Sequence, residues 1–261
     1  MPKVQEILQQ RRSDNKNSLI GYFPAGYPTL SESIDAAVTM CENGVDVLEL
    51  GVPYSDPVMD GLVIQQATET ALENGFRFRQ IFEAVKEITN RVDTPVLVMT
   101  YWNPVLQYGV KKFAEELRLA GGAGLITPDL IPDEAQEWLE ASEANDLERV
   151  FLVSPSSTDE RVKSAAGLSR GFAYAVSTMG ITGTRSEVDT AARKVVQKIK
   201  TQAPEQFAAV GIGISTADQA AEVSEYADAA IVGSSFVRAY QQGGIAALQA
   251  KVTEIVAGLK R

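Results

Sequence analysis

Histidine is absent from this 261-residue chain, and cysteine occurs once, at Cys41. Without histidine the chain cannot use a Ser-His-Asp triad, a histidine base or a histidine-ligated zinc ion. Any proton transfer must therefore use Asp, Glu, Tyr, Lys, Cys or water. A single cysteine cannot form an internal disulfide, which fits a reducing cytoplasm, and we expect Cys41 to be a small buried apolar residue rather than a nucleophile.

Positive charge is also scarce, with 24 Lys and Arg against 34 Asp and Glu and a net charge of -10. Such a chain lacks the basic surface that extended nucleic-acid binding requires, although backbone N–H groups can still hold a small anion. No apolar run reaches membrane-spanning length, and the polar start MPKVQEILQQ does not have the pattern of a signal peptide. We expect no nucleic-acid partner, no membrane partner and a cytoplasmic location.

Short apolar runs alternate with helical hydrophobic patterns along the chain. Because strand–helix alternation implies parallel strands, eight such units in this length predict an α/β fold, a (β/α)8 TIM barrel with an extra N-terminal helix, as one domain over residues 1–261. A doubly wound open sheet is the alternative. The segments 101–104 and 128–132 are predicted to be loops. The predicted strands are 19–23, the run around Glu49, 96–100, 123–127, 149–153, 171–176, 208–213 and 229–233.

The stretch 46–61 (DVLELGVPYSDPVMDG) joins a buried strand to an acidic loop. Side chains alternate across a strand, so Glu49 shares a face with Val47, opposite the two leucines. A carboxylate in a buried strand is costly unless it is paired or protonated. With Asp56 and Asp60 just beyond it, Glu49 belongs to a layout suited to acid–base catalysis at different pKa values. A salt-bridged glutamate above a solvated loop is the alternative.

Glycine is frequent where the last two predicted strands end, at 211–215 (GIGIS) and 233–235 (GSS). TIM barrels frequently bind phosphate in these two loops, where helix N-termini favour an anion. Ordinary strand-to-helix turns are the alternative for such glycines. We predict a phosphate site formed by these loops and the one before them, at Gly183, Gly213, Gly233 and Ser234.

Other polar and aromatic residues lie at the remaining predicted strand ends, which is where TIM-barrel sites form. Aromatic rings there favour a flat apolar ligand, although each ring alone would equally suit core packing. The acids Asp56 and Asp60 have oxygen ligands that Mg²⁺ accepts, but they match no ligand motif, so we predict no metal. The candidate substrate-binding residues are Tyr22, Thr100, Tyr101, Asp129, Tyr174 and Thr182.

Several motifs together resemble the tryptophan synthase alpha chain family. The most specific is ELGVPYSDPVMDG, and the likeness extends over nearly the whole length, through GYP, MTYWNP, STMGITG, GIG and the Gly233-Ser234 pair. The resemblance implies a TIM barrel that cleaves indole-3-glycerol phosphate to indole and glyceraldehyde 3-phosphate. It also implies a chain without a cofactor that pairs with a pyridoxal-phosphate-dependent beta chain in an α2β2 heterotetramer, to which indole passes for condensation with L-serine.

The resemblance assigns roles to individual residues. Glu49 matches the family's main acid–base group, and Asp60 matches its second catalytic carboxylate. Tyr174 matches a tyrosine close to the substrate, and Thr182 matches a loop residue that orients the acid on closure. The predicted phosphate residues match the family's phosphate site.

Leu62 departs from the family pattern, in which proline usually follows Asp60-Gly61. Proline at a helix start fixes φ without losing a hydrogen bond, so leucine is expected to loosen the loop and add apolar bulk beside the partner. We hypothesise that catalysis survives and that loop order or communication with the beta chain changes.

Two rival interpretations remain open at this point. Another phosphate-binding barrel, such as a sugar-phosphate isomerase or a prenyl transferase acting on glycerol phosphate, fits the fold but does not need both Glu49 and Asp60. A non-catalytic subunit that only switches on a partner enzyme would account for Leu62 but not for intact carboxylates.

Overall fold

The computed structural model describes residues 3–176, 185–211 and 213–259. Its strands are β1 (Ser18–Pro24), β2 (Val47–Gly51), β3 (Val96–Met99), β4 (Gly124–Ile126), β5 (Glu148–Val150), β6 (Leu152–Val153), β7 (Ala173–Val176), β8 (Ala208–Gly211) and β9 (Ala229–Val232). Its helices are α1 (Val4–Ser13), α2 (Leu30–Glu42), α3 (Leu62–Glu73), α4 (Gln80–Thr89), α5 (Trp102–Tyr108), α6 (Val110–Leu119), η1 (Pro132–Glu134), α7 (Gln136–Ala144), α8 (Asp159–Leu168), α9 (Arg185–Gln202), α10 (Ala217–Ser224) and α11 (Ser234–Leu259).

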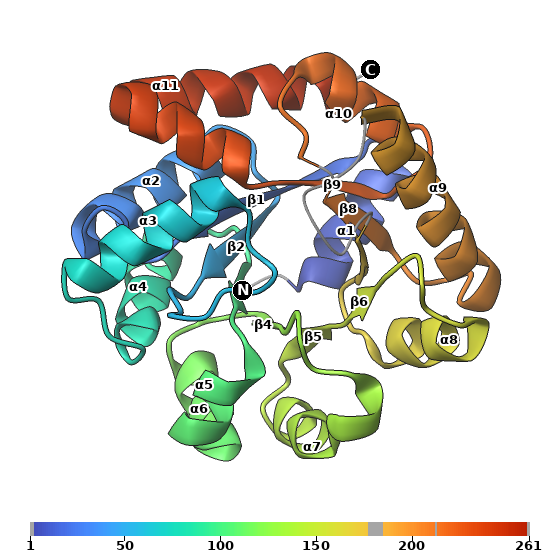
Figure 1. The fold of residues 1–261 in the computed structure, drawn as a ribbon, viewed down its shortest axis with the longest axis horizontal. Helices are drawn as coiled ribbons and strands as arrows, with labels where there is room; N and C mark the ends of the chain where they lie inside the picture. Colours follow the sequence, from blue (N-terminus) through green and yellow to red (C-terminus); the bar gives the residue numbers. More distant parts are fainter. Residues whose placement is uncertain (1–2, 177–184, 212, 260–261) are drawn as a thin grey trace.

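The strands form a ring of parallel pairs enclosed by helices (Figure 1). The order in the sheet is β5-β4-β3-β2-β1-β9-β8-β7-β6. Only Phe151 separates β5 from β6, so the two ends of the sheet are consecutive pieces of one stretch of chain. The sheet therefore curls into a nearly closed barrel. The (β/α)8 prediction is confirmed, with the fifth predicted strand divided in two, and the open-sheet alternative is wrong.

Helix α1, the predicted N-terminal helix, closes one end of the barrel. The backbone N–H groups of Val4 and Gln5 donate to the carboxylate of Glu148, at 2.8 and 3.0 Å, and so satisfy the free start of the helix. The buried side chains of α1 join an apolar cluster inside the barrel. This interior cluster comprises Val4, Leu8, Ile20, Val47, Leu97, Ile126, Val150, Phe172, Phe207, Ala209, Ala229 and Ile231.

A second apolar cluster fills the space between the barrel and its helices. It contains Leu48 and Leu50, whereas Val47 belongs to the interior cluster. The two faces predicted for this strand are therefore confirmed, and Glu49 faces inward with Val47. No helix in the described ranges is long and apolar enough to cross a membrane.

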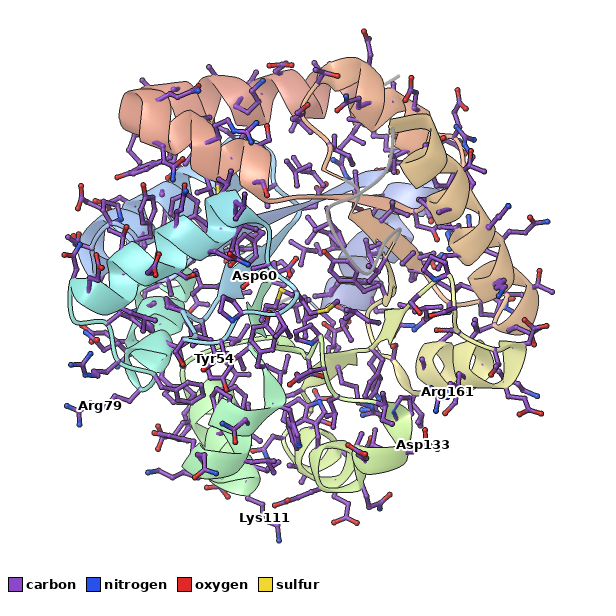
Figure 2. All side chains as sticks on the ribbon, in the orientation of Figure 1. Tyr54, Asp60, Arg79, Lys111, Asp133 and Arg161 are labelled. Carbon is purple, nitrogen blue, oxygen red and sulfur yellow. The ribbon has the colours of Figure 1, made fainter. Side chains whose placement is uncertain are left out.

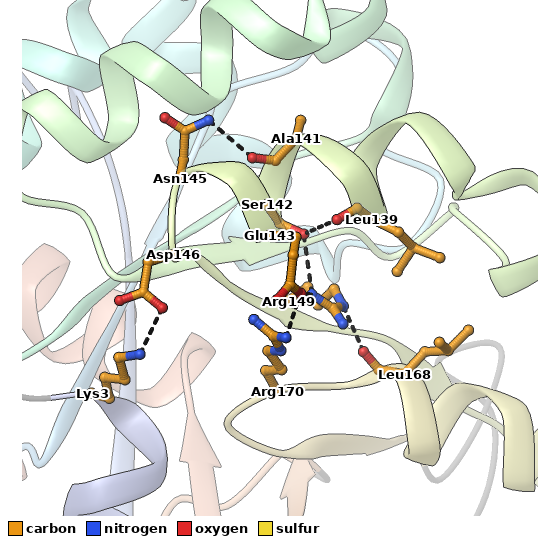
Figure 3. A network of polar contacts seen from close by, with 10 residues as sticks. All are labelled: Lys3, Leu139, Ala141, Ser142, Glu143, Asn145, Asp146, Arg149, Leu168 and Arg170. Carbon is orange, nitrogen blue, oxygen red and sulfur yellow. Dashed lines mark hydrogen bonds and ion pairs between the residues drawn. The ribbon is translucent and has the colours of Figure 1, made fainter.

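A polar network braces β5, next to the point where the sheet closes (Figure 3). The Arg149 guanidinium donates to the Leu168 carbonyl at 2.7 Å and to the Ser142 hydroxyl at 3.3 Å. It also pairs with Glu143 at 3.6 Å, and Arg170 pairs with the same carboxylate. The network joins α7, β5 and the end of α8, so it supports the barrel at its joint.

The prediction of a loop at 101–104 is wrong, because Trp102 begins helix α5. Pro104 is tolerated there since the N–H groups of a first helical turn have no intrahelical acceptor. The missing cap comes from a distant loop: both carboxylate oxygens of Asp129 accept the Trp102 N–H, at 2.9 and 3.1 Å. A short 3-10 helix, η1, likewise begins at the end of the other predicted loop.

Candidate active site

A polar layer lies inside the barrel above the interior cluster. Tyr22, Glu49 and Tyr174 each come two residues after a member of that cluster, so alternation along each strand turns all three inward. Tyr22 and Glu49 are register partners across β1 and β2. Each of the three side chains is one step along its strand from the interior cluster, so together they form the next layer inside the barrel.

Glu49 is a buried acid that keeps its proton near neutral pH. The residue is 1% exposed, and its Oε2 atom has no hydrogen-bond partner among the described residues. Burial, with the charge of Asp60 added, raises the pKa of Glu49 from 4.5 to about 8. The salt-bridged alternative finds no support, since no ion-pair partner of Glu49 lies in the described part of the chain. A protonated carboxyl in a dry site can act as a general acid.

Asp60 is the second carboxyl, in the loop between β2 and α3. Figure 2 shows it near the middle of the ring, whereas Arg79 and Lys111 extend from the outer edge. Burial raises the pKa of Asp60 from 3.8 to about 6. Near neutral pH Glu49 is therefore protonated while Asp60 is ionised, which separates the roles of acid and charge stabiliser.

The loop that carries Asp60 is a closed turn held from two sides. The Asp60 N–H donates to the Pro57 carbonyl at 3.3 Å. On one side, the Tyr101 hydroxyl accepts the Met59 N–H at 2.8 Å. On the other, the Gln65 amide donates to the Asp60 carbonyl at 2.7 Å. Gln65 belongs to no motif and was not predicted to be a site residue, because in the sequence nothing but its place in the first turn of α3 distinguishes it from other glutamines.

The two inner tyrosines pack against glycines at strand ends. A Cβ atom at Gly211 would lie 2.7 Å from the Tyr174 hydroxyl oxygen, and one at Gly233 would lie 3.1 Å from Cδ1 of Tyr22. Gly51 also lies directly under the Tyr22 hydroxyl. Burial first, and then the charges of the two acids, raise the pKa of both tyrosines. Their hydroxyls are therefore neutral hydrogen-bond donors facing the acids.

The structure describes three of the four predicted phosphate-binding residues, Gly213, Gly233 and Ser234. Gly213 is exposed, has φ of 71° and has open space around it, so its backbone is accessible to an anion. Ser234 is the first residue of α11, whose start has free N–H groups. Gly233 contributes the carbonyl that closes the first turn of α11 as well as room for Tyr22. Gly183 and the predicted substrate residue Thr182 lie outside the described residues.

The other predicted substrate residues lie at the ends of β3 and β4. Thr100 is buried, and its hydroxyl has no hydrogen-bond partner in the described ranges. Tyr101 lies beside the turn that carries Asp60, because its hydroxyl accepts the Met59 N–H at 2.8 Å, and burial and then the charge of Asp60 raise its pKa. Asp129 already serves as the cap of α5. Tyr101 thus adjoins the turn that carries Asp60, whereas Asp129 has an established partner within the chain.

A cavity of about 490 Å³ lies to one side of these residues, lined mainly by the loop after β4, the segment after β6 and helix α8. None of the described candidate catalytic or substrate residues lines it. Met59 lies on its wall next to Asp60, and Leu152, the register partner of Tyr174, lines it as well. Asp56 is exposed, and its carboxylate accepts the Ser55 hydroxyl at 2.6 Å. In the part of the chain that the structure describes, no three Asp, Glu or Cys side chains converge as metal ligands.

Comparisons with known proteins agree with this geometry. The sequence model of the tryptophan synthase alpha chain matches residues 8–260. The tryptophan synthase alpha chain of Leifsonia xyli subsp. xyli is 59% identical over 261 residues, which cover 100% of both chains. A structure of Mycobacterium tuberculosis tryptophan synthase superposes with a TM-score of 0.94 at 48% identity, covering 99% of this chain and 98% of the other. A Pyrococcus furiosus chain, from a study of mutual activation in the tryptophan synthase α2β2 complex, gives 0.84 at 32% identity, covering 92% and 98%.

Proposed function

The chain belongs to the tryptophan synthase alpha chain family, and from this premise we propose that Glu49 and Asp60 perform the cleavage chemistry. The family makes the chain a carbon–carbon lyase of tryptophan biosynthesis, which cleaves indole-3-glycerol phosphate to indole and glyceraldehyde 3-phosphate. The alpha chain works in an α2β2 complex, and indole passes to the beta chain for condensation with L-serine. Pyridoxal phosphate belongs to the beta chain, and the alpha chain carries no cofactor.

Glu49 acts as the proton donor in this proposal. Its buried carboxyl, with a pKa of about 8, is the single observation that supports the role most directly. Protonating C3 of the indole ring gives a cationic indolenine, and the bond from C3 to the glycerol phosphate can then break. The electron pair of that bond returns to the ring and restores indole.

Asp60 acts through its charge. Its pKa of about 6 leaves it ionised near neutral pH, so it can stabilise the positive charge that develops at the ring nitrogen. The glycerol C3′ hydroxyl must lose its proton as the aldehyde forms. Glu49, having given its own proton to the ring, is a carboxylate at that stage and can accept it.

The remaining site residues bind and orient the substrate in this proposal. The neutral hydroxyls of the inner tyrosines and the buried hydroxyl of Thr100 face a flat aromatic ring, and backbone N–H groups hold the phosphate. We also propose that residues 1–261 act as one TIM-barrel domain in the cytoplasm. The proposed substrate contacts are Tyr22, Thr100, Tyr101, Asp129, Tyr174 and Thr182, and the proposed phosphate contacts are Gly183, Gly213, Gly233 and Ser234.

Indole release from indole-3-glycerol phosphate tests the proposal. Wild type, Glu49→Gln and Glu87→Gln are compared with and without the beta chain, in the absence of serine so that indole is not consumed. Glu87 is exposed on α4, so its variant is the matched control. We expect activity in wild type and control, raised by the beta chain, and its loss in Glu49→Gln. An inactive wild type would favour the non-catalytic subunit, and an active Glu49→Gln variant would refute the assigned acid.

A further inference from the structure

One side chain joins both ends of the acidic turn. The turn 57–60 is closed by the Asp60 N–H, which donates to the Pro57 carbonyl at 3.3 Å. The Gln65 Nε2 atom donates to the carbonyl of Asp60 at 2.7 Å and, over a longer 3.4 Å, to the carbonyl of Pro57. A primary amide carries two N–H groups, so it can bond both acceptors at once. Gln65 therefore acts as a bridge between helix α3 and the turn.

The start of α3 gives the turn little other support. Its N-cap is Gly61, which has no side chain to cap the helix, and its first turn has no acidic residue. Leu62 follows at the first helical position and is 64% exposed, so packing does not fix it there. Proline would fix φ at this position, and leucine does not. The attachment of the turn to α3 thus depends on the Gln65 amide.

We propose that Gln65 is a positioning residue for Asp60, which holds the turn 57–60 so that the half-buried carboxylate stays close to Glu49. The inference rests on the proposed function and deepens it. Both acceptors of the Gln65 amide are backbone carbonyl groups of the turn, so it acts through Asp60 rather than on the substrate. Tyr101 anchors the opposite side of the same turn through the Met59 N–H. A small displacement of a catalytic group lowers a rate greatly, by up to ~100-fold for about 1 Å.

A pair of neighbouring glutamines provides the test. Gln65→Met keeps the length of the side chain and removes the amide, while Gln66→Met makes the same change on the exposed side of α3. Indole release is measured at saturating indole-3-glycerol phosphate with the beta chain present and serine absent. We expect Gln65→Met to lower kcat at least about tenfold, with a smaller change in KM, and Gln66→Met to match wild type.

The pH profile separates positioning from a merely structural role. Without the bridge the turn admits water to Asp60, so the acidic limb of the kcat profile, near pH 6 in wild type, should move to lower pH in Gln65→Met. Adding Leu62→Pro to Gln65→Met should restore part of the lost rate, because it fixes the start of α3.

The outcomes are distinct. If Gln65→Met keeps its rate, or loses rate with an unmoved acidic limb and a lowered Tm, Gln65 does not position Asp60. If wild type and Gln66→Met release no indole, the proposed function itself fails. If those two are active and Gln65→Met equals them, the proposed function stands and the role of Gln65 alone is refuted.

Discussion

Replacing Glu49 by glutamine should stabilise the protein at alkaline pH while it removes cleavage activity. A glutamate in an unfolded chain has a pKa near 4.5, whereas burial holds Glu49 at about 8. Between these values the unfolded chain releases a proton that the folded chain retains, so wild type loses stability as pH rises from 4.5 through 8. At about 1.36 kcal/mol per pKa unit, the full loss is about 5 kcal/mol. Gln cannot ionise, so the variant avoids it.

Urea unfolding measures this difference directly. The completely buried Trp138 gives a fluorescence signal for unfolding. The variant-minus-wild-type difference in free energy of unfolding should grow by about 2.5 kcal/mol between pH 5 and pH 7, and by a further ~1.4 kcal/mol between pH 7 and pH 9. The raised pKa of Asp60 also destabilises both proteins as pH rises, but Asp60 is common to both, so that contribution largely cancels in the difference.

Glu87→Gln is the matched control for stability as well as for activity. Glu87 is exposed on α4, so its replacement should leave the free energy of unfolding close to that of wild type. A Glu49→Gln difference that does not change with pH would refute a buried, protonated Glu49. A wild type more stable than the variant at pH 9 would refute it more strongly.

Two further predictions concern catalysis. Cleavage should follow a bell-shaped pH profile, because the rate falls below pH 6 as Asp60 gains a proton and above pH 8 as Glu49 loses one. Measuring kcat from pH 5 to 9 checks this prediction. A flat profile would contradict both roles. Gly211→Ala should lower kcat/KM about tenfold, since its new methyl group forces the Tyr174 hydroxyl to move. Gly167→Ala, in open space on α8, is its control, and equal activity of the two variants would show that the Tyr174 position is unimportant.

Much of the fold follows from local patterns in the sequence. Strand β9 ends within one residue of its predicted run 229–233, and β1 extends its predicted run by one residue at each end. Such elements depend on the spacing of apolar residues, which sequence carries directly. The inward face of Glu49 follows in the same way, from alternation along one strand.

Contacts between distant segments account for the errors. Helix α5 begins where a loop was expected because Asp129, 27 residues further along the chain, caps it. Gly211, in the predicted anion-binding turn, also provides room for Tyr174 from the neighbouring strand, which no local pattern in the sequence indicates. Gln65 was missed for the same reason, since its importance lies in two carbonyl groups of a turn rather than in any motif.

The sequence by itself determined which chemical groups are present and which way they face: a carboxyl on the inner face of a strand, a second carboxyl in the next loop, and no histidine. Only the tertiary structure decided their proton affinities. A pKa depends on how much water surrounds the group, and the surroundings of Glu49 come from separate strands that carry Tyr22 and Tyr174 and from a turn that is held by Gln65. Because the packed barrel removes that water, an ordinary glutamate becomes an acid that retains its proton at neutral pH.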